Sequence, residues 1–153
     1  MPRSSPANFT PNRLHPNIPT RERITTWLTL FGLDHMNSLA TFLPPHLILQ
    51  ACSLITKSIV PGTLGNYAAG LLRFTQFCDE HCIPEVLRMT ASEAILTLFV
   101  TAKGAHIVSA TTIKHWLLRL ELWHTINGAP WLGGSALRRA LKVRTSLPLT
   151  PAI

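Results

Sequence analysis

The side chains best suited to chemistry in this sequence are Lys and Arg residues crowded into its last third. Residues 103–153 hold seven basic residues and one acid, whereas residues 1–60 hold five and two, and residues 61–102 hold two and four. The net charge of +7 is therefore concentrated near one end of the chain. Phosphate oxygens attract Lys and Arg, and each phosphate that is neutralised releases counterions. The pattern predicts binding to a polyanion, and by itself it does not separate DNA, RNA and anionic lipid.

Groups that would support metal or nucleophilic chemistry are few. Cys78, His81 and Cys82 are close in sequence, but zinc needs three or four ligands, and both cysteines fall on an apolar helical stripe. The single tyrosine, Tyr67, lies on the same stripe, and no Arg…His-x-x-Arg…Tyr pattern is present. We therefore expect no catalytic residue, no metal, no cofactor and no small-molecule substrate.

Four tryptophans offer possible stacking platforms for unpaired bases. Trp116 and Trp123 are seven residues apart, a spacing that places both on one face of a helix. We expect the tryptophans to belong to the core.

Composition places the chain among globular proteins. Hydrophobic residues make up 46% of 153 residues, enough for one domain with a buried core. Charged residues make up only 14%, against roughly 25% in an average protein, so uncharged polar residues or a partner must cover the surface. Three cysteines argue against a disulfide framework, and no signal peptide or membrane span is apparent. We expect an intracellular protein, in the nucleus if it binds DNA, with no membrane contact.

The elements that must position the basic residues are helices, because the sequence shows no sustained period of two. Residues 1–19 contain five prolines and predict a flexible tail. Residues 20–60 predict a helical extension of two helices. Thr20 caps the first, which stops at Gly32, and the second runs over His46–Ile59, strongly apolar and packed inward.

Four more helices are predicted within residues 61–146, followed by a linker stub at 147–153. The first runs from Thr63 to Cys82. Its apolar stripe is Leu64, Tyr67, Leu71, Phe74, Cys78 and Cys82. The second follows a capping box at Thr90–Glu93. Its expected buried residues are Ile95, Leu98, Phe99 and Ala102.

The last two predicted helices carry most of the basic residues. Ser109 caps the first of them, which ends at Asn127-Gly128, and Ser135 caps the second. The expected core side chains are Ile113, Trp116, Leu117, Leu120, Trp123, Leu137, Ala140 and Leu141. The sequence thus predicts an all-α fold in which a four-helix bundle follows two N-terminal helices.

Four patterns in this order resemble the N-terminal core-binding domain of tyrosine recombinases, of the eukaryotic, particularly fungal, mobile-element type. They are T-x-x-x-Y-x-x-x-L-x-x-F-x-x-F-C at 63–78, T-I-K-x-W-L-x-x-L-x-x-W-H at 112–124, N-G-A-P-W at 127–131 and L-R-R-A-L-K at 137–142. The resemblance implies a SAM-like helical bundle that grips one side of a DNA duplex. In the family a separate catalytic domain supplies the Arg, Lys, His and Tyr that cut DNA. None of those residues is recognisable here, and after Lys142 the sequence departs from the family, which often has Gly and a longer linker.

The resemblance and the basic pattern together predict a double-stranded DNA-binding module without a cutting half. Helix N-terminal hydroxyls and off-stripe polar side chains join the cations as candidate contacts. The candidate residues are Thr63, Asn66, Arg73, Ser109, Thr111, Thr112, Lys114, Arg119, Arg138, Arg139, Lys142 and Arg144. The alternatives are a basic face that binds nothing, a protein-interaction module that associates with itself or with a recombinase catalytic domain, and a non-functional gene fragment.

Overall fold

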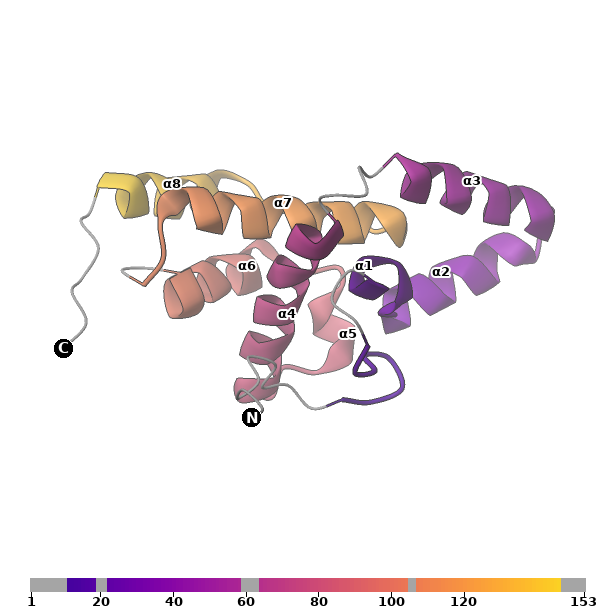
Figure 1. The fold of residues 1–153 in the computed structure, drawn as a ribbon, viewed down its shortest axis with the longest axis horizontal. Coiled ribbons are helices and arrows are strands. Elements are labelled where there is room, and N and C mark those ends of the chain that lie inside the picture. Colours follow the sequence, from indigo (N-terminus) through magenta and orange to yellow (C-terminus); the bar gives the residue numbers. More distant parts are fainter. Residues whose placement is uncertain (1–10, 19–21, 59–63, 105–106, 147–153) are drawn as a thin grey trace.

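The computed structural model describes residues 11–18, 22–58, 64–104 and 107–146; the side chains of residues 25, 56, 64–68 and 143–146 are not described. The structure is about 70% helical, with no strand in the described part, so the all-α prediction is confirmed (Figure 1). The helices are α1 (Arg23–Thr26), α2 (Leu30–Ala40), α3 (Pro45–Lys57), α4 (Leu64–Glu80), α5 (Glu85–Arg88), α6 (Glu93–Phe99), α7 (Ala110–Ile126) and α8 (Ser135–Ser146), with a π-helical turn at Val100–Gly104 after α6.

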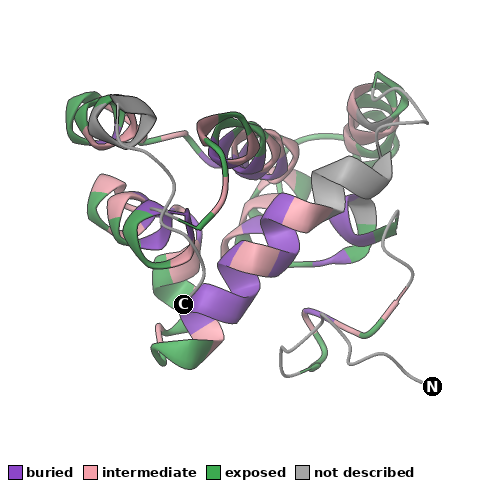
Figure 2. Ribbon diagram, turned by 60° about the vertical axis from the view of Figure 1, so that its left-hand side comes forward, coloured by how far each residue is buried: buried purple, intermediate pink, exposed green. Residues whose placement is uncertain are grey.

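Helix α4 runs through the middle of the molecule and forms the centre of the core (Figure 2). The predicted stripe is confirmed at Leu71, Phe74 and Cys78, which are buried. The buried surface of α4 is wider than the predicted apolar stripe, because every described residue from Gly70 to Cys78 except Arg73 is buried. Cys82 was predicted wrongly: it lies beyond the end of α4 with a positive φ of 52° and is exposed.

Helices α4 and α7 cross at a glycine. A Cβ atom at Gly70 would lie 2.7 Å from the backbone oxygen of Trp116, so the crossing requires the missing side chain. Beside the crossing, Phe74 and Phe99 meet edge to face at 5.4 Å between ring centroids, and Phe99 lies 5.9 Å from Trp116. The core is therefore an aromatic cluster shared by α4, α6 and α7.

The predicted helix from Thr20 to Gly32 is wrong, because the chain turns at Trp27. Trp27 is extended and buried, and its indole N–H donates to the Pro16 carbonyl at 2.9 Å. Thr29 then caps α2 by accepting from the backbone N–H of Gly32 at 2.9 Å. The hydrogen bond of the Trp27 indole and the separate cap of α2 accompany a break in the helix at Trp27. The chain therefore forms two helices, α1 and α2, in place of the single predicted one.

The predicted second helix is present as α3, but its predicted burial is wrong. Helix α3 contacts α2 and the end of α7, and none of its described side chains is buried. Leu49 is 64% exposed and Leu54 is 70% exposed. Helices α2 and α3 form a hairpin at one end of the long axis of the molecule (Figure 1).

The start of α6 also differs from the prediction. Its cap is Ser92, whose hydroxyl accepts from the backbone N–H of Ile95 at 3.1 Å, so Thr90–Glu93 is no capping box. The core register shifts accordingly: Leu96 and Phe99 are buried, whereas Leu98 and Ala102 are exposed. The predicted inner face is thus confirmed at Phe99 and wrong at Leu98 and at Ala102, which lies in the π-helical turn after α6.

Candidate nucleic-acid interface

Helix α8 presents a cationic face to solvent. Ser135, Arg138, Arg139 and Lys142 line a shallow hollow of about 270 Å³. Their positions follow the spacing i, i+3, i+4 and i+7, which places them on one side of a helix. Leu137 on the inner side is buried, and Leu141 is half-buried. Helix α8 is thus amphipathic as predicted, with three exposed cations on its outer face.

The carboxylate of Glu93 fixes the beginning of α8. Its Oε2 accepts from the backbone N–H of Gly134 at 2.6 Å and from that of Leu137 at 3.2 Å. A carboxylate at this position satisfies free N–H groups and complements the positive end of the helix dipole. The sequence had assigned the cap to Ser135, which is instead the first helical residue. The two positions are more than forty residues apart, so no local pattern could have revealed this role of Glu93.

Lys114 of α7 lies beside the cationic face of α8. Together with Arg138 it borders a groove of about 350 Å³ between the two helices. The floor of this groove is largely apolar and is formed by Leu117, Leu118, Trp131, Leu137 and Leu141. The groove also contains Glu121, the one acid of the C-terminal third. Sequence analysis did not predict this apolar floor, because it depends on how α7 and α8 pack.

The N-terminus of α7 confirms the predicted cap. The Ser109 hydroxyl accepts from the backbone N–H of Thr112 at 3.1 Å and lies 3.0 Å from the Thr112 hydroxyl. Ser109, Thr111 and Thr112 are the predicted DNA-contacting residues at this helix start. Ser109 and Thr112 are hydrogen-bonded to each other. Thr111 is exposed.

Two of the other predicted DNA contacts, Arg73 and Arg119, are half-buried on α4 and α7. Arg73 is half-buried on α4, where one guanidinium nitrogen donates to the Gln76 side-chain oxygen at 3.1 Å. Arg119 is half-buried, with its Cβ close to Gly70 at the α4–α7 crossing. Thr63 lies outside the described residues. The side chains of Asn66 and Arg144 lie outside them as well.

Two cations outside α8, Arg88 and Lys103, form ion pairs with carboxylates. Arg88 lies 3.0 Å from Asp79 and 3.4 Å from Glu85, and Lys103 lies 2.6 Å from Glu80. These ion pairs link α4 to α5 and α4 to the turn after α6. None of them involves a residue of α8. The two arginines and the lysine on the face of α8 are thus the densest group of exposed cations in the described part of the chain.

Of the groups that suggested metal or nucleophilic chemistry, Cys78 is buried in the core, His81 and Cys82 are exposed, and the side chain of Tyr67 lies outside the described residues. Burial raises the pKa of the Cys78 thiol to about 12, so it stays protonated. His124 is fully buried, with Nδ1 2.8 Å from the Leu120 carbonyl and Nε2 accepting from the backbone N–H of Ala91. Burial lowers its pKa. No cluster of three or more metal-ligating side chains occurs among the described residues.

The predicted core role of the tryptophans is confirmed for Trp27, Trp116 and Trp123, which are buried, while Trp131 is half-buried in the α7–α8 groove. None of the described helices has the length and apolar character needed to cross a bilayer.

Comparison of the chain with protein-family models, curated proteins and solved structures gave no match. The sequence patterns that resemble the recombinase core-binding domain fall mainly on α4, α7 and α8. These are the helices that form the central crossing and the cationic face. The chemistry of that face is therefore the basis for a functional proposal.

Proposed function

We propose that this chain is a double-stranded DNA-binding module that docks on one side of a duplex through α8 and the first half of α7. The observation that carries the proposal is the exposed face of Arg138, Arg139 and Lys142, with Lys114 across the adjoining groove. Three cations spread over two successive turns of a helix match a row of phosphates better than they match a single anion. Anchoring of α8 by Glu93 holds these cations in a fixed orientation.

The dimensions suit a duplex. Helix α8 has 12 residues and is about 18 Å long at 1.5 Å per residue. The major groove of B-DNA is roughly 12 Å wide and admits a helix whose flanks meet the phosphates on either side. Contacts of Arg and Lys with phosphates position a protein without reading bases. We therefore expect binding that tolerates many sequences.

We also propose that this module derives from a tyrosine recombinase. The patterns on α4, α7 and α8 resemble the core-binding domain of tyrosine recombinases, so residues 61–146 would be a SAM-like bundle of that type, acting in the nucleus. In that family the cutting residues belong to a separate domain. We therefore expect this chain to leave supercoiled plasmid DNA neither nicked nor relaxed, which a plasmid mobility assay would check.

Fluorescence anisotropy with a labelled duplex of about 20 base pairs tests the proposal. The decisive variant is Arg138→Ala/Arg139→Ala/Lys142→Ala, because these side chains are exposed and off the core face. We expect at least about 30-fold weaker binding to every duplex, since each lost phosphate contact removes a share of the counterion release. Circular dichroism should show unchanged helicity.

Lys57→Ala supplies the control, because Lys57 is an exposed cation on α3, a helix that does not contribute to the cationic face of α8. We expect it to change the affinity less than twofold. If wild-type protein binds no duplex even at about 50 mM salt, or if the control weakens binding as much as the triple variant, the proposal is wrong.

A second candidate function, a protein-interaction module, is favoured by the apolar floor of the α7–α8 groove and by the exposed leucines of α3. Association through such surfaces would show little dependence on salt and would survive the triple substitution.

A further inference from the structure

The α7–α8 groove combines an apolar floor with a charged rim. It has a volume of about 350 Å³ and lies between two helices that run antiparallel beside each other (Figure 1). Leu118 in its floor is 52% exposed, and Leu141 and Trp131 are only half-buried. Apolar side chains that stay open to water in a groove between helices form the usual floor of a site for an amphipathic helix.

The charges on the rim of this groove select the ligand by sign. Lys114 of α7 and Arg138 of α8 are exposed, and neither is paired with a carboxylate among the described residues. Glu121, the one acid of the groove, is half-buried and lies seven residues after Lys114, about 10 Å along the axis of α7. The rim thus has two cations and a single acid, and the acid is two turns away from Lys114.

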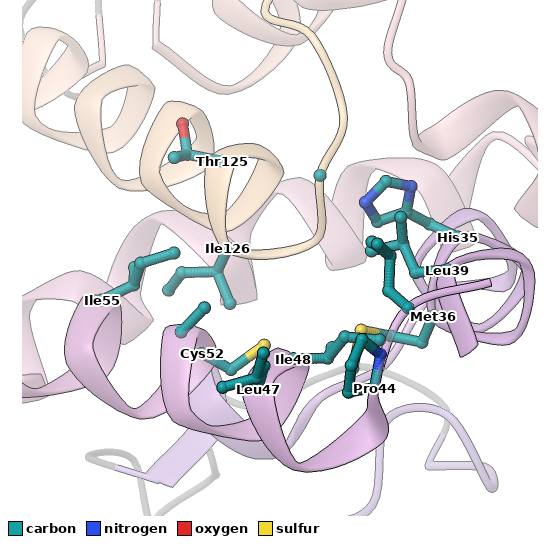
Figure 3. A pocket seen from close by; sticks show the side chains of 13 residues that line it. His35, Met36, Leu39, Pro44, Leu47, Ile48, Cys52, Ile55, Thr125 and Ile126 are labelled. Carbon is teal, nitrogen blue, oxygen red and sulfur yellow. The ribbon is translucent and has the colours of Figure 1, made fainter.

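The other large groove, between α2, α3 and the end of α7, lacks such a rim (Figure 3). It has a volume of about 390 Å³, and Met36, Leu39 and Ile48 are among its apolar lining side chains. None of the described residues that line it is Asp, Glu, Lys or Arg. It therefore does not distinguish one apolar partner from another, whereas the rim of the α7–α8 groove does.

We propose that the α7–α8 groove binds an acidic amphipathic helix of a partner protein. Apolar side chains of that helix, at positions i, i+4 and i+7, pack on Leu117, Leu118 and Leu141. Its carboxylates lie beside Lys114 and Arg138. The site is separate from the outer face of α8, and binding there does not depend on whether the chain binds DNA.

The dimensions and the charge of the groove both suit this partner. The α7 wall extends for about 10 Å from Lys114 to Glu121, and the repeat from i to i+7 of a helix rises by the same distance. Partner acids are attracted beside Lys114 and repelled beside Glu121, so we expect them at one end of the apolar stripe. The net charge of +7 also speeds the encounter with an acidic partner.

Fluorescence anisotropy of the full chain with three labelled synthetic peptides tests the proposal. The acidic probe is an alanine-rich helix of about 15 residues, with leucines at i, i+4 and i+7 and glutamates around the first leucine. Lysines replace the glutamates in the basic probe, and serines replace the leucines in the serine probe. We expect saturable binding of the acidic probe, at least about fivefold weaker binding of the basic probe, and no binding of the serine probe.

Variants of the chain locate the site. Leu118→Ser should weaken binding of the acidic probe about tenfold, because it removes apolar surface from the floor. Leu98→Ser is the matched control, since Leu98 is 57% exposed on α6, outside the groove, and it should change the affinity less than about twofold. Lys114→Glu should abolish the preference for the acidic probe over the basic one. Lys57→Glu, which reverses an exposed charge on α3, should preserve it.

Far-ultraviolet circular dichroism should show the same helicity for these variants and the wild type, because the substituted side chains are exposed. The proposal is wrong if the wild type binds the acidic probe no more tightly than the basic probe, or if the serine probe binds as tightly as the acidic one. It is also wrong if Leu98→Ser weakens binding as much as Leu118→Ser. DNA is absent from these measurements, so a failure here is distinct from a failure of the proposed DNA-binding function.

Discussion

Helices α3 and α7 are both rich in apolar side chains, and the fold places them in opposite environments. Helix α7 lies between α4 and α8 and buries Ile113, Trp116, Leu117, Leu120, Trp123 and His124. Helix α3 lies at the far end of the molecule and buries none of its described side chains. Apolar content alone therefore does not say whether a helix is part of a core. The position of a helix among its neighbours decides this.

The same comparison separates two kinds of surface. The α7–α8 end is cationic, with Arg138, Arg139 and Lys142 on an anchored helix, whereas the α2–α3 end is nearly uncharged. A cationic helix face suits an extended polyanion, and an uncharged apolar face suits a protein helix. These two surfaces lie at opposite ends of the long axis of the molecule (Figure 1).

The largest expected effect contrasts the two helices directly. Leu120→Ala should lower the free energy of unfolding by about 2–5 kcal/mol, because Leu120 is fully buried and its removal leaves a cavity. Leu54→Ala should change it by less than about 0.5 kcal/mol, because Leu54 is 70% exposed. Urea titrations followed by circular dichroism measure both. Equal losses would mean that α3 belongs to the same core as α7.

Acid should weaken the bundle through His15, which packs between Trp27 and Trp123 at 5.3 and 6.3 Å between ring centroids. Burial, with repulsion from Arg88, lowers the pKa of His15 from 6.5 to about 4. The unfolded chain therefore binds this proton first, and stability present above pH 6.5 is lost as the pH falls toward 4. The lowered pKa of His124 acts in the same direction.

The size of this acid effect is at most about 3 kcal/mol for His15, at roughly 1.4 kcal/mol per pKa unit. Asp79 and Glu85 also face His15, and burial raises the pKa of Glu85, which opposes the loss at lower pH. Thermal unfolding between pH 7.5 and 5 isolates the histidine contribution. His15→Leu should flatten the pH dependence in that interval, and an unchanged slope would exclude His15 as its source.

Glu93 gives a smaller effect at the cationic end. Glu93→Gln should destabilise the protein by about 1–2 kcal/mol, because it removes the charge that caps α8 through Gly134 and Leu137. Asp34→Asn removes the same charge from the exposed hairpin and should cost less than about 0.5 kcal/mol. Paired urea titrations compare the two variants. A larger loss for Asp34→Asn would show that the Glu93 cap contributes little.

The smallest expected effect concerns the acid in the α7–α8 groove. Glu121→Gln should strengthen duplex binding about two- to threefold, because it removes a negative charge beside Lys114 and Arg138. Asp34→Asn, which makes the same change at the other end, should leave the affinity unchanged. Anisotropy titrations at about 100 mM salt would detect the difference, and equal gains would place the DNA elsewhere.

The sequence predicted α7 and the faces of α8 well, because local signals agree there. Ser109 caps the start of α7, and the apolar residues from Ile113 to Trp123 recur at the three- and four-residue spacing of a helix. Gly128, with a φ of 79°, follows the end of the helix. The apolar spacing of α6 was less informative, because Leu98 and Phe99 are adjacent apolar residues and only Phe99 is buried.

Features that depend on distant contacts could not be predicted from the sequence. The anchoring of α8 by Glu93 joins residues more than forty positions apart. The break at Trp27 depends on the Pro16 carbonyl, and the exposure of α3 depends on where the hairpin comes to lie. Of the candidate DNA contacts, Arg138, Arg139 and Lys142 share one face of α8 because helix geometry is local. Arg73 and Arg119 are half-buried beside helices that no sequence pattern could place.

The salt dependence of duplex binding by the wild-type chain tests the central proposal most directly. Four or five phosphate contacts predict that log Kd rises with log salt at a slope of about 4, with micromolar affinity near physiological salt. Replacing Arg138, Arg139 and Lys142 by Ala should reduce that slope by two to three. A slope near zero, or a slope that the triple substitution leaves unchanged, would contradict the assignment of α8 as the DNA-binding face.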